Sequence, residues 1–152
     1  MEFRRMINAD VCRVAEIEAE CFPDPYSERS ISDILCTEGA MCFSALDEGR
    51  VVAYFIGRLI APEGELYRIA THPKYRQRGI AYRLLDYSVK TSKGQGLEAL
   101  FLEVRESNHP AISLYRGYGF RKISVRRNYY KNPTEDAVIM LYGKVTDDNF
   151  SI

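Results

Sequence analysis

The sequence has no excess of charge of either sign, because 21 lysines and arginines are matched by 21 aspartates and glutamates. A neutral chain produces no long-range field that would attract nucleic acid or a membrane surface. It also has no apolar run approaching the roughly 18 residues of a membrane-spanning helix, and its first residues, MEFRRMINAD, contain no apolar signal-peptide core. We therefore expect a cytoplasmic protein that binds neither nucleic acid nor membrane.

Residues that bind metals or form disulfides are also scarce. The chain has four cysteines and two histidines, and no C-x-x-C pair occurs among them. This pattern gives little support to a zinc site or a disulfide framework, so we expect no metal. His72 and His109 each precede a proline and are assigned structural roles. The cysteines are expected to be reduced and buried: Cys12, Cys21, Cys36 and Cys42.

Length and periodicity predict one mixed α/β domain. A chain of 152 residues can bury a substantial core, and we expect a single domain over 1–146 and a polar tail over 147–152. Helices are predicted after the capping residues Asp10 and Ser27, after Gly79, and from Pro110 to Gly119. Strands come first as a meander and then alternate with helices, which favours one sheet with helices on both faces. The predicted strands are 2–8, 41–46, 51–60, 65–71, 98–104, 122–129 and 136–144.

The segment RQRGIA places two arginines and a glycine directly before an apolar helix. A helix N-terminus offers free backbone N–H groups, and a glycine there lets an anion approach the backbone closely. Arg76, Arg78 and Gly79 therefore indicate a pyrophosphate site, although a solvated basic turn explains the spacing equally well. The segment matches neither of the glycine-rich motifs of nucleoside triphosphate or dinucleotide binding.

IATHPKYRQRGIAYRLL resembles the acetyl-CoA signature R/Q-x-x-G-x-G/A of the GNAT N-acetyltransferases, matched by Arg76, Gly79 and Ala81. LFLEVRESNHPAISLYRGYGF and RRNYY are similar to later motifs of the RimI-type enzymes, which acetylate the N-terminal alanine of a ribosomal protein. The resemblance covers about 3–145. It implies a largely antiparallel sheet of about seven strands, and acetyl-CoA as the co-substrate.

The resemblance also implies which residues hold the cofactor. Backbone groups of Ile69, Ala70 and Thr71 would meet the thioester and the pantetheine arm, and Asn108 would contact the cofactor further along. Arg76 belongs to the signature. The pyrophosphate would be held by Gln77, Arg78, Gly79, Ile80, Ala81 and Tyr82.

Two residues are candidates for the chemistry. Glu103 lies inside an apolar strand, where a charge is costly unless it faces a cleft or a partner. Tyr115 lies on an apolar helical stripe, where a buried hydroxyl still needs a partner. From spacing alone, Glu103 could equally be a solvent-facing glutamate, and a core tyrosine is the natural interpretation of Tyr115. The RimI-type resemblance implies that Glu103 is the general base and Tyr115 the general acid. Glu65 and Tyr67 remain fallback candidates.

The acceptor is predicted to be a protein or peptide N-terminus, plausibly the N-terminal alanine of a ribosomal protein. An α-amine is partly neutral near pH 7.5, whereas a lysine requires roughly 4 kcal/mol to deprotonate. Tyr26, Tyr129 and Tyr130 are the candidate acceptor-binding residues, and Tyr26 stands where RimI-type sequences often have tryptophan. Two alternatives stay open: an acetyltransferase for a small amine, and a non-catalytic acyl-CoA-binding module. The sequence leaves the oligomeric state undecided.

Overall fold

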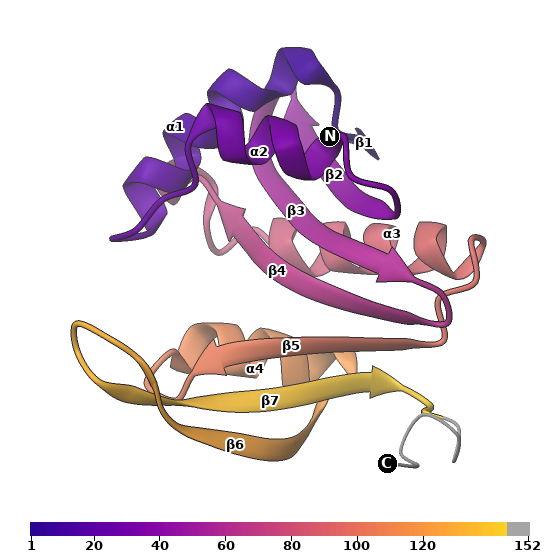
Figure 1. The fold of residues 1–152 in the computed structure, drawn as a ribbon. Helices are drawn as coiled ribbons and strands as arrows, with labels where there is room; N and C mark the ends of the chain where they lie inside the picture. The colour runs from indigo at the N-terminus through magenta and orange to yellow at the C-terminus, as the bar shows by residue number, and fades with distance from the viewer. Residues whose placement is uncertain (146–152) are drawn as a thin grey trace.

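The structure is a computed structural model and describes residues 1–145, so the expected tail over 147–152 lies outside the described residues. Seven strands form one sheet in the order β1-β2-β3-β4-β5-β7-β6 (Figure 1). Neighbouring strands are antiparallel except for the parallel pair β4–β5, which confirms the predicted mixed, largely antiparallel sheet. The strands are β1 (Glu2–Arg5), β2 (Ala40–Asp47), β3 (Arg50–Ile60), β4 (Glu63–Thr71), β5 (Ala99–Arg105), β6 (Arg121–Tyr130) and β7 (Glu135–Gly143).

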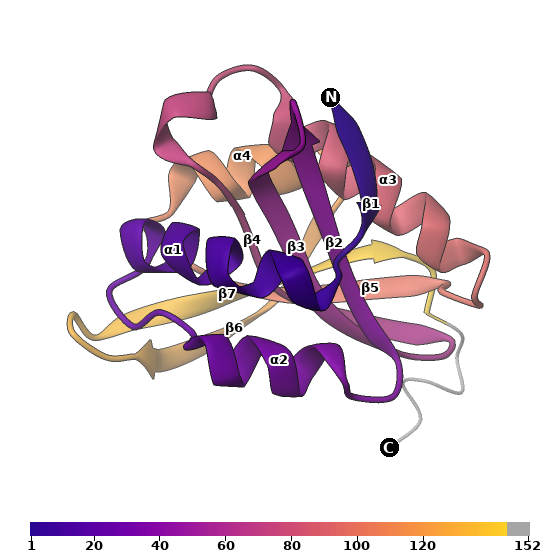
Figure 2. The same cartoon turned by 90° about the horizontal axis from the view of Figure 1, so that it is seen from above.

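Helices cover both faces of the sheet, as predicted. α1 and α2 pack on one face, and α3 and α4 lie on the other (Figure 2). Each face has its own apolar cluster, which explains why β2 and β3 are buried along most of their length, with side chains in both clusters. None of the described helices is long and apolar enough to cross a membrane. The helices are α1 (Val11–Cys21), α2 (Glu28–Leu35), α3 (Ile80–Lys93) and α4 (His109–Tyr118), with short 3-10 turns η1 (Asn8–Asp10) and η2 (Pro73–Tyr75).

Most of the predicted helix starts are confirmed. The Ser27 side chain accepts a hydrogen bond from the Ser30 amide and caps α2, and Pro110 stands in the first turn of α4. The prediction for Asp10 is wrong in its detail, because its carboxylate does not cap α1. That carboxylate instead accepts the Ile7 amide at 3.0 Å and forms a two-pronged ion pair with Arg4 at 2.7 and 2.9 Å.

The prediction that all four cysteines are buried is also wrong. All four are free, but only Cys42 is buried; Cys12 and Cys36 are exposed and Cys21 is half-buried. Cys12 and Cys36 occupy solvent-facing positions, because the apolar faces of their segments are supplied by the neighbouring isoleucines and valines.

A β-bulge at Tyr67 separates the beginning of β4 from its end. Ile56 of β3 lies opposite Arg68, and the next residue, Gly57, lies opposite Leu66, so Tyr67 is an extra residue on β4. Such a bulge bends the strand that carries it. A Cβ at position 57 would collide with the Glu65 carbonyl group, so the close approach of the two strands requires glycine there.

The bend changes how β4 relates to β5. Parallel pairing runs from Glu63 and Ala99 to Leu66 and Leu102 and then stops. In Figure 1 the two strands lie side by side near their beginnings and diverge towards their ends. Beyond Leu66, β4 is still paired with β3 on its other side, so the strand keeps its shape while its second edge is left open.

The Asp10 ion pair leads to a prediction about stability and pH. Burial raises the pKa of Asp10, but hydrogen bonds from Arg4, Ile7 and Ser44 outweigh that effect and lower the pKa below its ordinary value of 3.8. The stabilisation is therefore complete above pH 3.8 and is lost as the pH falls through the lower folded-state pKa. Asp10→Asn should reduce the free energy of unfolding at pH 7, and urea titrations should show the gap to wild type closing towards pH 3.

The exposed Asp33 offers a matched control for that substitution. Asp33→Asn should follow the wild-type stability curve across the same pH range. A gap for Asp10→Asn that stays constant down to pH 3 would contradict the role assigned to its carboxylate.

Candidate active site

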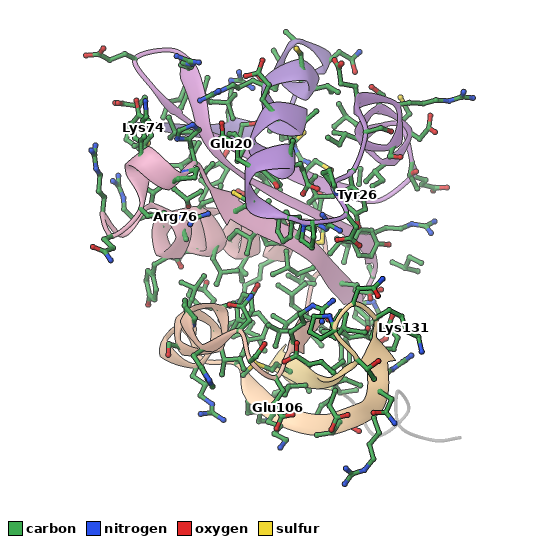
Figure 3. The ribbon with its side chains drawn as sticks, turned by 90° about the vertical axis from the view of Figure 1, so that its left-hand side faces the viewer. Glu20, Tyr26, Lys74, Arg76, Glu106 and Lys131 are labelled. Carbon is green, nitrogen blue, oxygen red and sulfur yellow. The ribbon has the colours of Figure 1, made fainter. Side chains whose placement is uncertain are left out.

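The diverging ends of β4 and β5 form one side of a cleft of about 680 Å³. The α1–α2 loop (22–27), α4 and the end of β6 also contribute to it. Figure 3 looks towards this end of the molecule, with Tyr26 on the part above the opening and Lys131 on the part below it. Seven residues expected to bind or react line this one cleft: Tyr26, Ile69, Glu103, Asn108, Tyr115, Tyr129 and Tyr130.

Glu103 faces the cleft and has a charged partner. Its carboxylate lies 3.2 Å from Nε of Arg126, and 21% of its side chain is exposed. Its neighbours Leu102 and Val104 belong to the apolar cluster on the side of α3 and α4. Glu103 therefore points to the other side of the sheet, the one that carries α1 and α2. The half-buried carboxylate is thus held in place by a cation while remaining open to a ligand.

Glu65 is a second carboxylate in the same cleft. It lies across from Phe101 in the β4–β5 pairing, and Phe101 precedes Glu103 by two residues. Burial and the nearby charge of Glu103 raise the pKa of Glu65. The cleft therefore contains two carboxylates in unequal environments, and Glu103 is the one that has an ion-pair partner.

Tyr115 projects from α4 into the cleft from the opposite face of the sheet. Its ring packs on Phe120 at 5.5 Å, and only 7% of the residue is exposed. Burial raises the pKa of Tyr115, so the phenol keeps its proton at neutral pH. Its hydroxyl forms no hydrogen bond to the described residues, which leaves this proton donor at the cleft wall available to a ligand.

The three tyrosines expected at the acceptor site lie on two sides of the opening. Tyr26 comes from the α1–α2 loop, while Tyr129 and Tyr130 lie at the end of β6 with their rings 5.1 Å apart. Interaction with the Glu103 carboxylate raises the pKa of Tyr129, and burial together with the Glu103 charge raises the pKa of Tyr130 to about 12. The end of β6 is therefore in contact with the candidate base.

The predicted phosphate cradle forms a separate, smaller hollow of about 180 Å³ beside the start of α3. Gly79 adopts φ = +74° directly before the helix, and a Cβ built on it would meet nothing within 4 Å. Gln77 also has a positive φ of 63°, so the turn bends twice before the first helical N–H groups. Seven predicted residues line the hollow: Thr71, Arg76, Gln77, Gly79, Ile80, Ala81 and Tyr82.

Three of the predicted cofactor residues, Arg76, Arg78 and Ala70, have contacts within the protein. Arg76 donates to the Thr71 carbonyl at 3.3 Å and to Sγ of Cys21 at 3.2 Å, so its side chain turns towards the end of α1. Arg78 lies over the ring of Tyr75. Ala70 is buried in the cluster beneath α1, and it can offer a ligand only its backbone.

Asn108 has a structural task besides lining the cleft, because it is the N-cap of α4. Its side chain accepts a hydrogen bond from the Ala111 amide at 3.3 Å. The two histidines have the structural positions expected of them. Nδ1 of His72 accepts the Lys74 amide, and His109 is the first residue of α4.

These features fit acetyl-CoA. The start of α3 presents open backbone N–H groups. The space beside Gly79 is open because glycine has no Cβ, so a phosphate group can approach the backbone there. The open edge of β4 after Leu66 leaves backbone groups that an amide-containing arm can pair with. Thr71, between the two hollows, has a buried Oγ1 without a hydrogen-bond partner among the described residues.

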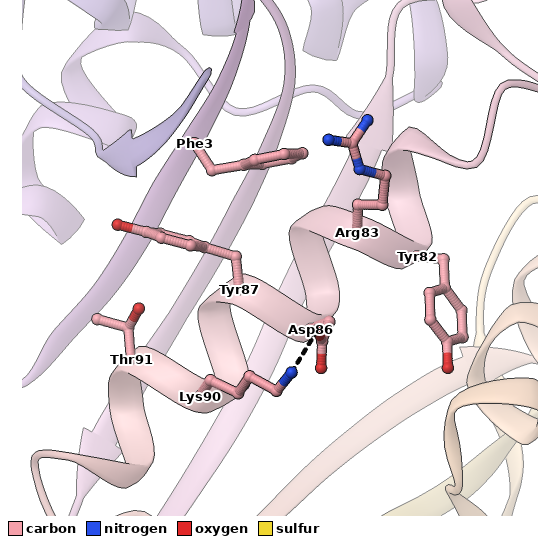
Figure 4. A pocket seen from close by; sticks show the side chains of 7 residues that line it. All are labelled: Phe3, Tyr82, Arg83, Asp86, Tyr87, Lys90 and Thr91. Carbon is pink, nitrogen blue, oxygen red and sulfur yellow. Dashed lines mark ion pairs between the residues drawn. The ribbon is translucent and has the colours of Figure 1, made fainter. Parts of the chain in front are cut away.

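A further hollow lies on the outer side of α3 and is unlike a reaction site (Figure 4). Phe3 stacks on Tyr87 there. Asp86 is paired with Lys90 at 3.0 Å and accepts a hydrogen bond from Tyr118, so its charges and polar groups satisfy one another. The hollow shares Tyr82 with the cradle and no lining residue with the cleft, and we assign it no role.

Sequence reasoning missed Arg68 and Glu18, whose side chains form a buried ion pair beside the cleft at 2.6 Å. Arg68 appears in the sequence only as one polar residue in the strand ELYRIAT, and Glu18 as one of three acidic residues in a helix. A charged residue inside an apolar strand is a signal that could have been followed, but it does not identify its partner.

Comparisons with known proteins agree with this geometry. The family model described as "Acetyltransferase (GNAT) family" matches residues 11–120. The [ribosomal protein bS18]-alanine N-acetyltransferase of Escherichia coli (strain K12) is 33% identical over 133 residues, which cover 86% of this chain and 89% of that protein. An N-alpha-acetyltransferase of Saccharolobus solfataricus is 32% identical over 144 residues and 86% of each chain.

Solved structures show the same relationship. The crystal structure of the ribosomal-protein-S18-alanine N-acetyltransferase from Escherichia coli superposes with a TM-score of 0.87, at 29% identity and 99% coverage of both chains. The fold, the cleft and these matches define an acyl-CoA-dependent transferase. The chain belongs to the GNAT acetyltransferase family, and it is an acetyl-CoA-dependent N-acetyltransferase.

The cradle can be tested with two matched glycine substitutions. Gly79→Val should abolish most of the affinity for acetyl-CoA, because the new side chain would occupy the space beside the α3 N-terminus. Gly49, in the turn between β2 and β3, has a similar φ of +80° and an equally open surrounding. Gly49→Val should therefore cause a similar backbone strain and leave cofactor affinity unchanged, as measured by isothermal titration calorimetry. Equal affinities in the two folded variants would contradict the cradle.

Proposed function

We propose that this enzyme transfers an acetyl group from acetyl-CoA to the N-terminal α-amine of a protein, plausibly the N-terminal alanine of a ribosomal protein. The observation that carries the proposal is the shared cleft, which Glu103, Tyr115 and the three candidate acceptor tyrosines all line. The relatives named for alanine N-acetylation of a ribosomal protein support the same substrate class.

The shape of the site suits a peptide. A second hollow of about 520 Å³ adjoins the cleft, and Glu65, Tyr67 and Glu103 line both. Together they form an extended depression over β3, β4, β5 and β7, longer than a single small amine requires. An N-terminal residue can enter beside Glu103 while the following residues remain outside the reaction site.

We assign proton acceptance to Glu103. Its carboxylate faces the cleft and is oriented by Arg126 at 3.2 Å. An α-amine has an ordinary pKa of about 7.8, so a single carboxylate acting through a water molecule is sufficient to deprotonate it near neutral pH. A lysine side chain would demand far more, because its pKa is about 10.4.

We assign proton donation to Tyr115. Acetyl-CoA supplies a thioester, and its sulfur needs a proton as it leaves. Tyr115 is a buried residue whose pKa is raised by that burial, and its hydroxyl has no hydrogen-bond partner among the described residues. It lies on α4, on the far side of the cleft from Glu103, so the two proton transfers take place on separate sides of the reacting carbonyl group.

An acetylation panel tests the proposal. Peptides that differ in their first residues should be acetylated, with a small residue such as alanine preferred, and mass spectrometry should locate the acetyl group on the α-amine. The panel includes polyamines and aminosugars. If these amines are acetylated far more efficiently than any peptide, the small-amine alternative is favoured. If no acceptor is acetylated, the non-catalytic module is favoured.

Glu103→Gln should lower turnover with the preferred peptide by about 10²–10⁴-fold, the usual contribution of a general base. Acetyl-CoA affinity should stay the same, because the side chain lies on the acceptor side of the cleft. The defect should shrink as the pH rises, since a larger fraction of the acceptor is then neutral without help. Glu65→Gln is the matched control, and a larger loss in that variant would transfer the role to Glu65.

Tyr115→Phe should slow acetyl transfer and leave measurable activity, because a thiolate is a reasonable leaving group even without protonation. The ring that packs on Phe120 is retained, so the melting temperature should remain close to that of wild type. Peptide preference should be unchanged, since the hydroxyl acts on sulfur. Substitutions at Tyr26, Tyr129 or Tyr130 should instead alter the preference. Equal rates for Tyr115→Phe and wild type under conditions where chemistry limits turnover would return Tyr115 to a packing role.

A further inference from the structure

Arg68 of β4 contacts four residues of α1 and the α1–α2 loop next to the acceptor cleft. Its Nη1 donates to the carboxylate of Glu18 at 2.6 Å, and its Nη2 donates to the Asp24 carbonyl at 3.1 Å. The guanidinium lies over the ring of Phe22 at 4.3 Å and over that of Tyr26 at 4.2 Å. Only 13% of the side chain is exposed. A planar cation is therefore held by a carboxylate, a carbonyl and two aromatic faces.

Glu18, the partner of Arg68, is completely buried. Its carboxylate also accepts the hydroxyl of Tyr54 at 2.6 Å and the amide of Tyr26 at 2.8 Å. A buried carboxylate is stable only when charges and hydrogen bonds replace its hydration, so the position of Glu18 depends on Arg68. Glu18 in turn fixes the backbone of the α1–α2 loop at Tyr26.

The loop has few other attachments. Among the residues that the structure describes, the hydrogen bonds that tie residues 23–26 to the rest of the protein go to Glu18 and Arg68. The same segment supplies Pro23, Asp24 and Tyr26 to the wall of the acceptor cleft. The loop has no regular element of its own, and its shape is set by these hydrogen bonds, by the ion pairs of Arg68 with Glu18 and Asp24, and by two ring contacts.

We propose that Arg68 is a positioning residue for the acceptor, which holds the α1–α2 loop in the conformation that receives the incoming peptide. The inference rests on the proposed function for its substrate, and on the contacts above for its mechanism. Without the guanidinium the loop samples other conformations. The acceptor affinity is then multiplied by the fraction of time for which the loop is correctly placed. Arg68 touches neither Glu103 nor Tyr115 through any hydrogen bond or ion pair, so the rate at saturating acceptor stays nearly unchanged.

The test compares Arg68→Ala with Arg4→Ala. Arg4 also pairs with a buried carboxylate, that of Asp10, but it lies at β1 and not at the cleft. Both substitutions leave a buried acid without its cation, so both should lower thermal stability. Only Arg68→Ala should raise the KM for the peptide, by about tenfold if the loop is correctly placed a tenth of the time. The turnover number and the KM for acetyl-CoA should change little.

Chemical rescue provides a second readout. Millimolar guanidinium is far below denaturing concentrations, and it can occupy the slot that Arg68→Ala leaves between Phe22, Tyr26 and Glu18. The KM for the peptide should then return towards the wild-type value, whereas methylammonium, which lacks the planar fork, should have little effect. Arg68→Lys keeps the charge beside Glu18 and should give an intermediate KM. It also replaces Arg68→Ala if that variant does not fold.

Hydrogen exchange at the Tyr26 amide tests the loop without any acceptor. This amide donates to Glu18, so it should be protected in wild type and in Arg4→Ala, and should exchange much faster in Arg68→Ala until guanidinium is added. Unchanged exchange or an unchanged KM in Arg68→Ala would overturn the inference, as would a loss confined to the turnover number. If wild type acetylates no peptide, the proposed function fails, and the exchange measurement alone decides the role of Arg68.

Discussion

Parallel hydrogen bonding between β4 and β5 stops after Leu66 and Leu102, and this interruption makes the candidate active-site cleft possible. A sheet that paired to its end would have no opening at its centre. The bulge at Tyr67 bends β4 away, and Gly57 allows the neighbouring strand to approach closely enough for the bulge to form. The price is a set of unpaired backbone groups, and such groups favour a ligand that can pair with them.

The two faces of the sheet contribute different residues to the opening between β4 and β5. The side that carries α3 and α4 supplies the cradle at Gly79 and the hydroxyl of Tyr115, and both would act on the cofactor. The side that carries α1 and α2 supplies the loop with Tyr26, while Glu103 reaches the cleft from β5. Cofactor and acceptor would then enter from opposite directions and meet where β4 and β5 diverge.

Much of the fold followed from local sequence. Ser27, Pro110 and the glycine before α3 mark helix starts by their own chemistry, and the alternation of apolar residues identified the strands. Asp10 shows the limit of such reasoning, because an acidic residue before a helix can bind an arginine as well as cap the helix. The cysteines show another limit, since their exposure depends on which helix face meets the sheet.

The candidate site could be predicted from the sequence only in part. Glu103, Tyr115 and the turn around Gly79 could be named because their motifs resemble those of a known family. The point at which β4 leaves β5 could not be predicted, because a bulge depends on the register of three strands at once. The pairing of Glu18 with Arg68 joins residues 50 positions apart, so no local pattern reveals it.

The most direct test is a crystal structure with a bisubstrate compound in which coenzyme A is joined through an acetyl group to the α-amine of an alanine-initiated peptide. We predict that the pyrophosphate lies at the start of α3 beside Gly79. The acetyl linkage should lie between Glu103 and Tyr115, with the peptide leaving past Tyr26 and Tyr129. A complex in which the linkage lies outside the opening between β4 and β5, or in which the peptide does not touch the α1–α2 loop, would contradict the account.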